Sequence, residues 1–276
     1  MADDVEELKS RDRTDQAMKW AYSLFPRMES LPPKVEQGSA LAGDDKRYSL
    51  MPTSHLAWIG LSAAIEHFYA ASLLWNATDQ ATMPSAYSSL LRPALVGAGQ
   101  AYWLLAPTSR DERVHRTLLL AREDTQRARA LSDDVRRSPG RFGANDEWAQ
   151  SEANKMLTTF DKRLAEIDKQ IDPSRKPKAY SQTTMIEAVA ARLSPTDRVT
   201  EFALLYMWRT TSGDAHALMW QKFARGAGDR VTESDGHNSV FRDEQSHAAF
   251  GMNVAIVKMV LERALELHEL RRQKHR

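Results

Sequence analysis

Residues 204–220 hold the side chains best suited to chemistry, because this apolar run contains Arg209 and His216 seven positions apart. On a continuous helix that separation returns two side chains to nearly the same face, about two turns apart. Arginine stays protonated and can hold a phosphate through two hydrogen bonds, whereas histidine exchanges protons near neutral pH. The spacing therefore predicts a site that binds and acts on a phosphate group, provided that Ser212-Gly213 does not end or bend the helix between them.

The run also resembles a known family signature. An arginine, four to six intervening residues and a histidine mark the HEPN superfamily of small all-helical nucleotide-binding and ribonuclease domains, and here six residues intervene. Tyr206 completes an order of tyrosine, arginine, serine and histidine that is similar to uncharacterised bacterial HEPN-like proteins. Those proteins also carry an arginine in an upstream apolar helix, as Arg92 stands in residues 90–95. The resemblance covers about residues 54–131 and 196–270.

The resemblance implies cleavage of RNA without a metal or other cofactor, of the toxin or phage-defence kind. A ribose 2′-hydroxyl would attack the adjacent phosphate, with His216 as general base or acid and Arg209 stabilising the charge that develops on phosphorus. Ser212 or Asp214 would orient the histidine, and Arg92 and Tyr206 would support the site. HEPN ribonucleases usually join two such motifs across a dimer, so a homodimer is implied, with a cognate antitoxin or other protein as a further partner.

Other pairs in the chain share this spacing. The second candidate is Arg242 with His247, because a polar residue directly follows that arginine as the HEPN pattern prefers, whereas Thr210 follows Arg209. The remaining matches lie in polar segments typical of solvated side chains: Arg110/His115, Arg230/His237 and Arg263/His268. A structural interpretation also stands, in which Arg209 and His216 form a hydrogen-bonded pair neutralised by Glu201 or Asp214. In the same way, Arg92 would form an ion pair with Glu66. The protein would then be a non-catalytic helical scaffold that binds a protein or nucleotide.

A metal centre is a third alternative. Glu-x-x-His occurs twice, and two such motifs with one glutamate from each of two further helices make a di-iron bundle site. The ligands would be Glu66, Glu112, His115, Glu201, Glu244 and His247. Glu112 argues against the set, because it lies at the start of a helix among several arginines rather than facing a core.

Helical periodicity recurs along the chain, and no segment alternates long enough to predict a strand. We expect an all-α, single-domain bundle of about seven to nine helices with long loops. Residues 1–52 would form an N-terminal helix and an extended arm, and residues 53–276 the HEPN-like domain. The helices are expected at 14–25, 53–76, 84–105, 110–131, 146–171, from 194 onward, and 243–273, with a loop at 226–238.

Composition limits the function classes. The net charge of +1 lacks the basic excess of a dedicated duplex-DNA binder but allows a local RNA contact. The absence of cysteine excludes disulfides, thiolate metal sites and cysteine nucleophiles. The acidic N-terminus does not have the pattern of a signal peptide, and the most apolar stretch, residues 55–75, carries Glu66 at its centre. We therefore expect a cytoplasmic protein that does not enter the membrane.

Overall fold

The structure is a computed structural model that describes residues 2–26, 32–175, 180–218, 220 and 246–274. These residues form nine α-helices and one short 3-10 helix, without a strand, so the predicted all-α fold is confirmed. None of the described helices is both long enough and apolar enough to cross a membrane.

The observed helices follow the predicted order with several shifted ends. They are α1 (Ala2–Ser23), α3 (Ala40–Asp45), α4 (Thr53–Ala77), α5 (Pro84–Leu105), α6 (Arg110–Arg136), α7 (Asp146–Gln170), α8 (Gln182–Leu193), α9 (Arg198–Ala215) and α11 (His247–Arg272), with the 3-10 helix η1 (Gly143–Asn145) before α7. The first helix starts twelve residues earlier than expected, and α3 and α8 are additional elements. The expected loop at 226–238 lies outside the described residues.

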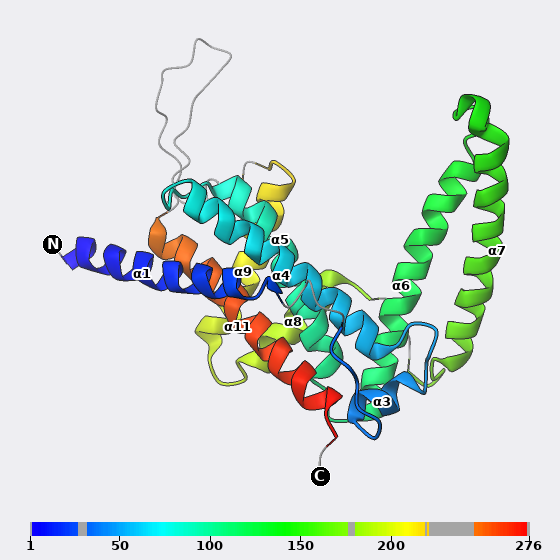
Figure 1. Ribbon diagram of the computed structural model, residues 1–276, viewed down its shortest axis with the longest axis horizontal. Coiled ribbons are helices and arrows are strands. Elements are labelled where there is room, and N and C mark those ends of the chain that lie inside the picture. Colours follow the sequence, from blue (N-terminus) through cyan, green and yellow to red (C-terminus); the bar gives the residue numbers. More distant parts are fainter. Residues whose placement is uncertain (1, 27–31, 176–179, 219, 221–245, 275–276) are drawn as a thin grey trace.

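Two antiparallel apolar helices, α4 and α5, form the centre of the bundle (Figure 1). Helices α1, α8, α9 and α11 pack around them and bury a core that includes Phe68, Trp75, Tyr87 and Phe250. The backbones of α4 and α5 come unusually close at Gly60 and Gly97. A Cβ atom on Gly60 would lie 2.7 Å from the carbonyl oxygen of Gly97. Two glycines therefore set the distance at which the central helices cross.

This crossing gives a prediction for stability. Replacing Gly97 by alanine should lower the free energy of unfolding by about 1–3 kcal/mol or more, because the new methyl group would collide with the backbone of Gly60, which cannot rotate away. Gly99→Ala is the matched control, since its Cβ would lie 3.1 Å from the flexible end of Ile186. Urea unfolding followed by circular dichroism compares the two variants. Equal losses would contradict this account of the crossing.

Aspartate side chains bind the free backbone N atoms at the starts of two helices, α4 and α9. Asp45 accepts hydrogen bonds from the backbone N (3.0 Å) and the hydroxyl (2.7 Å) of Ser54 at the start of α4. Asp197 caps α9 by accepting from the backbone N atoms of Val199 and Thr200, so this helix begins at Arg198 rather than at residue 194 as expected. Capping by Asp197 fixes the first turn of the helix that carries the candidate site.

Helices α6 and α7 form a long hairpin that projects from the bundle (Figure 1). Ion pairs between Arg122 and Asp168 (2.7 Å) and between Arg129 and Asp161 (2.6 Å) join its two helices. At its base, Arg113 and Asp44 form a fully buried pair that ties α3 to α6. Many arginines of α6 are thus paired with carboxylates, as expected for a solvated helix face with balanced charge.

His268 of α11 is buried beside the ring of Trp58, with centroids 5.7 Å apart. Burial, and then the charge of Arg272, lower the pKa of this imidazole. In the unfolded chain the imidazole of His268 takes up a proton at about pH 6.5, so acid favours the unfolded chain. The free energy of unfolding should fall below that pH, by at most about 1.4 kcal/mol per pH unit from this group. His268→Phe should flatten the dependence in urea titrations between about pH 7.5 and 5, and an unchanged slope would contradict this.

Candidate functional site

The helix α9 carries the arginine and histidine of the sequence motif. It continues without a break through Ser212 and Gly213 to Ala215, and His216 is the residue that caps its end. The backbone N of His216 still donates to the carbonyl oxygens of Ser212 and Gly213, both at 3.2 Å. The Ser212-Gly213 pair therefore does not end the helix between Arg209 and His216.

Three candidate side chains share one side of α9. At about 100° per residue, Arg209, Ser212 and His216 lie within roughly 60° of one another. Arg209 and His216 are exposed and Ser212 is half-buried. The neighbouring face is buried against the core through Leu204, Met207 and Thr211. We call Arg209, Ser212 and His216 the α9 stripe.

Asp214 lies away from this stripe. Its carboxylate is buried and accepts a hydrogen bond from the hydroxyl of Ser88 on α5 at 2.6 Å. This contact fixes the C-terminal end of α9 on the first turns of α5. Of the two residues expected to orient His216, only Ser212 shares its side of the helix.

Beside the stripe, Arg92 of α5 stacks on Trp208 of α9. The guanidinium carbon lies 4.5 Å from the ring centroid, a cation–π contact. Its Nε is buried and has no hydrogen-bond partner among the described residues, and burial lowers the pKa of Arg92. The prediction of an ion pair between Arg92 and Glu66 is wrong. Glu66 is exposed on α4, and the described part of the chain shows no ion pair between these two side chains. Arg92 is a half-buried cation with no carboxylate partner among the residues that the structure describes.

The other residues expected near the motif have separate contacts. Tyr206 is half-buried and stacks on Phe202, with ring centroids 5.9 Å apart. Glu201 pairs with Arg198 at 2.7 Å in the first turn of α9, away from Arg209. The structural interpretation, in which Glu201 neutralises Arg209, therefore has no contact to support it in the described structure.

The second candidate pair is only partly described, because Arg242 lies outside the described residues. His247 begins α11, and its Nδ1 lies 2.9 Å from Oε1 of Glu7, while its Nε2 lies 3.2 Å from the carbonyl oxygen of Gln80. Glu7 also accepts from the backbone N of His247 at 2.9 Å. These contacts give His247 a structural role, in joining α1, the turn that follows α4, and α11.

The alternative di-iron set does not assemble. No three histidine, aspartate or glutamate side chains gather to hold a metal ion in the parts of the chain that the structure describes. Glu112 instead forms ion pairs with Arg116 (2.8 Å) and Arg175 (3.1 Å). Four different helices carry the other described members of the set, which are His115, Glu66, Glu201 and His247, and these side chains do not converge. Glu244 lies outside the described residues.

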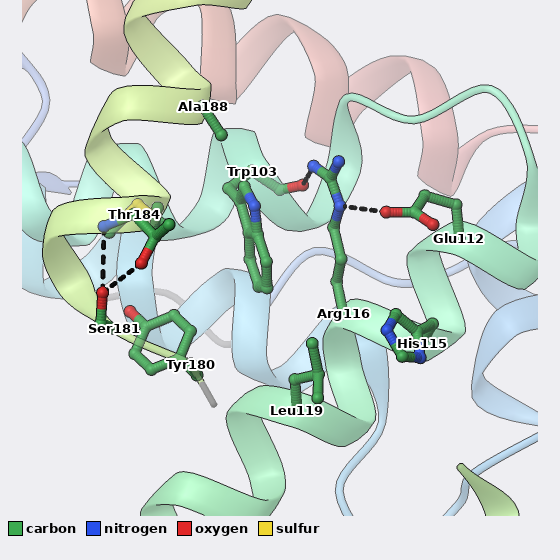
Figure 2. Close-up of a pocket in the computed structure, with 10 residues that line it drawn as sticks. Trp103, Glu112, His115, Arg116, Leu119, Tyr180, Ser181, Thr184 and Ala188 are labelled. Atoms are coloured by element: carbon green, nitrogen blue, oxygen red, sulfur yellow. Dashed lines mark hydrogen bonds and ion pairs between the residues drawn. The ribbon is translucent and has the colours of Figure 1, made fainter. Parts of the chain in front are cut away.

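The structure also reveals a hollow that the sequence analysis does not anticipate. It lies where the end of α5 meets the starts of α6 and α8, and Trp103, Arg116 and Tyr180 form part of its wall (Figure 2). Tryptophans at helical spacing are typical of a core, so Trp103 gives no separate signal in the sequence. Trp103 meets the other residues of this wall only because α8 packs against α5, and α8 is not among the predicted helices.

Comparisons with protein-family models, with curated proteins and with solved structures each give no match to this chain.

Proposed function

We propose that this chain is a HEPN-like, metal-independent endoribonuclease whose reactive groups are Arg209 and His216. The observation that carries the proposal is the α9 stripe, in which an arginine and a histidine face solvent on one side of an unbroken helix. Both side chains are exposed, and among the described residues no carboxylate forms an ion pair with Arg209, so the two side chains can reach an anionic substrate. Arg92 adds a second cation on the neighbouring helix.

The chemistry needs one phosphate and one adjacent ribose. His216 accepts the proton of the 2′-hydroxyl, whose oxygen then forms a bond to phosphorus while the bond from phosphorus to the 5′-oxygen breaks. A water molecule gives a proton to that leaving oxygen, and the protonated His216 gives its proton to the hydroxide that results. Arg209 donates hydrogen bonds to the non-bridging oxygens as their negative charge increases. The products are a 2′,3′-cyclic phosphate and a 5′-hydroxyl end.

Support for His216 comes from the preceding turn of α9. Ser212 stands one turn before His216 on the stripe and is placed to hydrogen-bond the substrate or the imidazole. Buried Asp214 acts at a distance from the reaction, because its bond to Ser88 fixes the end of α9. We propose a toxin or phage-defence role in the cytoplasm for this activity, with a homodimer bringing together two stripes and an antitoxin or other protein as regulator.

The proposal is tested with purified protein and total cellular RNA in excess EDTA. Fragments that end in 2′,3′-cyclic phosphate are the expected result, and DNA of matching sequence should remain intact because it lacks the attacking hydroxyl. Fragments with 3′-hydroxyl ends would contradict the mechanism.

The second candidate is a non-catalytic scaffold, and the α6–α7 hairpin is the observation in its favour. This hairpin projects from the bundle (Figure 1) and exposes large apolar side chains, including Leu131, Trp148 and Met156. Exposed apolar side chains on a projecting element are typical of a protein-binding surface. An absence of RNA cleavage together with binding through this hairpin would favour the scaffold.

A further inference from the structure

The hollow between α5, α6 and α8 has the size and wall of a small-molecule site. Its volume is about 330 Å³, near the lower end of the range for ligand pockets. Most of the wall is apolar, and a few polar groups occur among the apolar ones, which is the usual composition of such sites. A volume of this size suits a compact ligand of one or two rings rather than a dinucleotide or a polymer.

Its aromatic wall is held in place. The rings of Trp103 and Tyr180 contact each other, with centroids 5.6 Å apart and planes at 59°. The guanidinium of Arg116 lies 5.0 Å from the Trp103 centroid on α5. Arg116 donates to Oε1 of Glu112 and to the carbonyl oxygen of Trp103, both at 2.8 Å (Figure 2). The flat surfaces that would contact a ring are thus ordered before any ligand arrives, which reduces the entropy cost of binding.

Polar groups of the wall are mostly uncharged near neutral pH. Burial, and then the charge of Arg175, lower the pKa of His115, so its imidazole is neutral with one donor and one acceptor nitrogen. Burial raises the pKa of Tyr180 to about 12, so this phenol is also neutral. Ser181 and Thr184 offer hydroxyl groups that hydrogen-bond each other at the start of α8 (Figure 2). Such groups match the edge of a heteroaromatic ring.

The charges of the described residues around the hollow cancel. A second hollow of about 250 Å³ also has His115 in its wall. In the described part of the chain, the two walls together contain three arginines and three carboxylates, namely Arg47, Arg116, Arg175, Asp111, Glu112 and Asp172. An anionic group on a ligand would meet as many carboxylates as cations. Its negative charge would therefore add little to the affinity of the ligand.

We propose that the hollow between α5, α6 and α8 binds an uncharged planar heteroaromatic compound of the nucleobase or nucleoside class. The ring packs against Trp103 and Tyr180, and its polar edge meets His115. The site is distinct from the α9 stripe: Asp214 contacts α5 at Ser88, fifteen residues before Trp103, or roughly 22 Å along that helix. This inference does not depend on the proposed ribonuclease activity.

Isothermal titration of the full chain with adenosine and with AMP tests this proposal. Adenosine should bind with a Kd below about 1 mM, and AMP should bind within about tenfold of adenosine, because the balanced charges give the phosphate no advantage. Ala188→Trp should weaken adenosine binding at least about tenfold, since Ala188 lines the hollow and an indole there would fill it. Glu187→Trp is the matched control, because Glu187 is exposed on the same helix and outside the described lining.

Three results would overturn the proposal. The first is a lack of adenosine binding at about 1 mM ligand, with circular dichroism showing a folded protein. The second is AMP binding more than about tenfold tighter than adenosine, which would identify an anion site instead. The third is unchanged binding in Ala188→Trp, which would place the ligand elsewhere. RNA cleavage is measured separately, so a failure of either proposal is distinguishable from a failure of the other.

Discussion

Replacing His216 by alanine should lower the rate of RNA cleavage by about 10²–10⁴-fold, the usual contribution of a general acid or base. The physical reason is the loss of the group that accepts the 2′-hydroxyl proton. His216 is exposed at the end of α9, so its removal should leave the helix and the core intact. Single-turnover cleavage of a labelled RNA, with the substrate bound in advance, separates the effect on chemistry from any effect on binding.

His55→Ala is the matched control for this variant. His55 is exposed on α4 and has no part in the proposed chemistry, so the cleavage rate should stay within about twofold of the wild type. An equal loss of activity in both variants would indicate a general effect on the protein. Full activity in His216→Ala would remove this residue from the mechanism and turn attention to His247 and Arg242.

The second large effect concerns stability. Arg113→Ala should lower the free energy of unfolding by about 3–5 kcal/mol, because it leaves Asp44 buried without its partner. Arg113 donates to both oxygens of Asp44, at 2.6 and 2.9 Å, and to the carbonyl oxygens of Pro107 and Thr108 at 2.9 and 2.8 Å. The substitution would therefore remove four hydrogen bonds at the junction between α3 and the projecting hairpin. Urea unfolding followed by circular dichroism measures the loss.

Arg110→Ala is the comparison that isolates burial. Arg110 approaches the same carboxylate at 3.5 Å, but its side chain is 53% exposed, whereas that of Arg113 is 3% exposed. Exposed ion pairs contribute about 0–1 kcal/mol, so Arg110→Ala should have a small effect. Similar losses in both variants would contradict the claim that the buried pair holds α3 on α6.

The central helices were predictable to within a residue or two because their sequences are apolar for six turns and Pro84 marks a start. The first helix was predicted too short for a physical reason. In its described side chains, the first buried residue is Thr14, so the preceding turns carry no apolar periodicity. Helix α3 was missed because it is six residues long and is stabilised by a tertiary contact, the buried pair between Asp44 and Arg113.

For the candidate site, the sequence was informative about α9 and uninformative about its neighbours. The seven-residue separation placed Arg209 and His216 on one side of a helix, and the unbroken helix preserves that relation. Arg92 and Trp208 are more than one hundred positions apart, so their stacking follows from the packing of α5 on α9 and not from any local pattern. The hollow at Trp103 depends in the same way on α8, a helix absent from the prediction.

The most direct test of the central claim compares one RNA with the same RNA carrying a single 2′-deoxy sugar at the mapped cleavage site. Both substrates are incubated with the wild-type protein in excess EDTA, and the new ends are identified chemically. We predict cleavage of the unmodified RNA to a 2′,3′-cyclic phosphate and no cleavage at the deoxy position. Cleavage at the deoxy position, or activity that EDTA abolishes, would contradict a metal-independent attack by the 2′-hydroxyl assisted by Arg209 and His216.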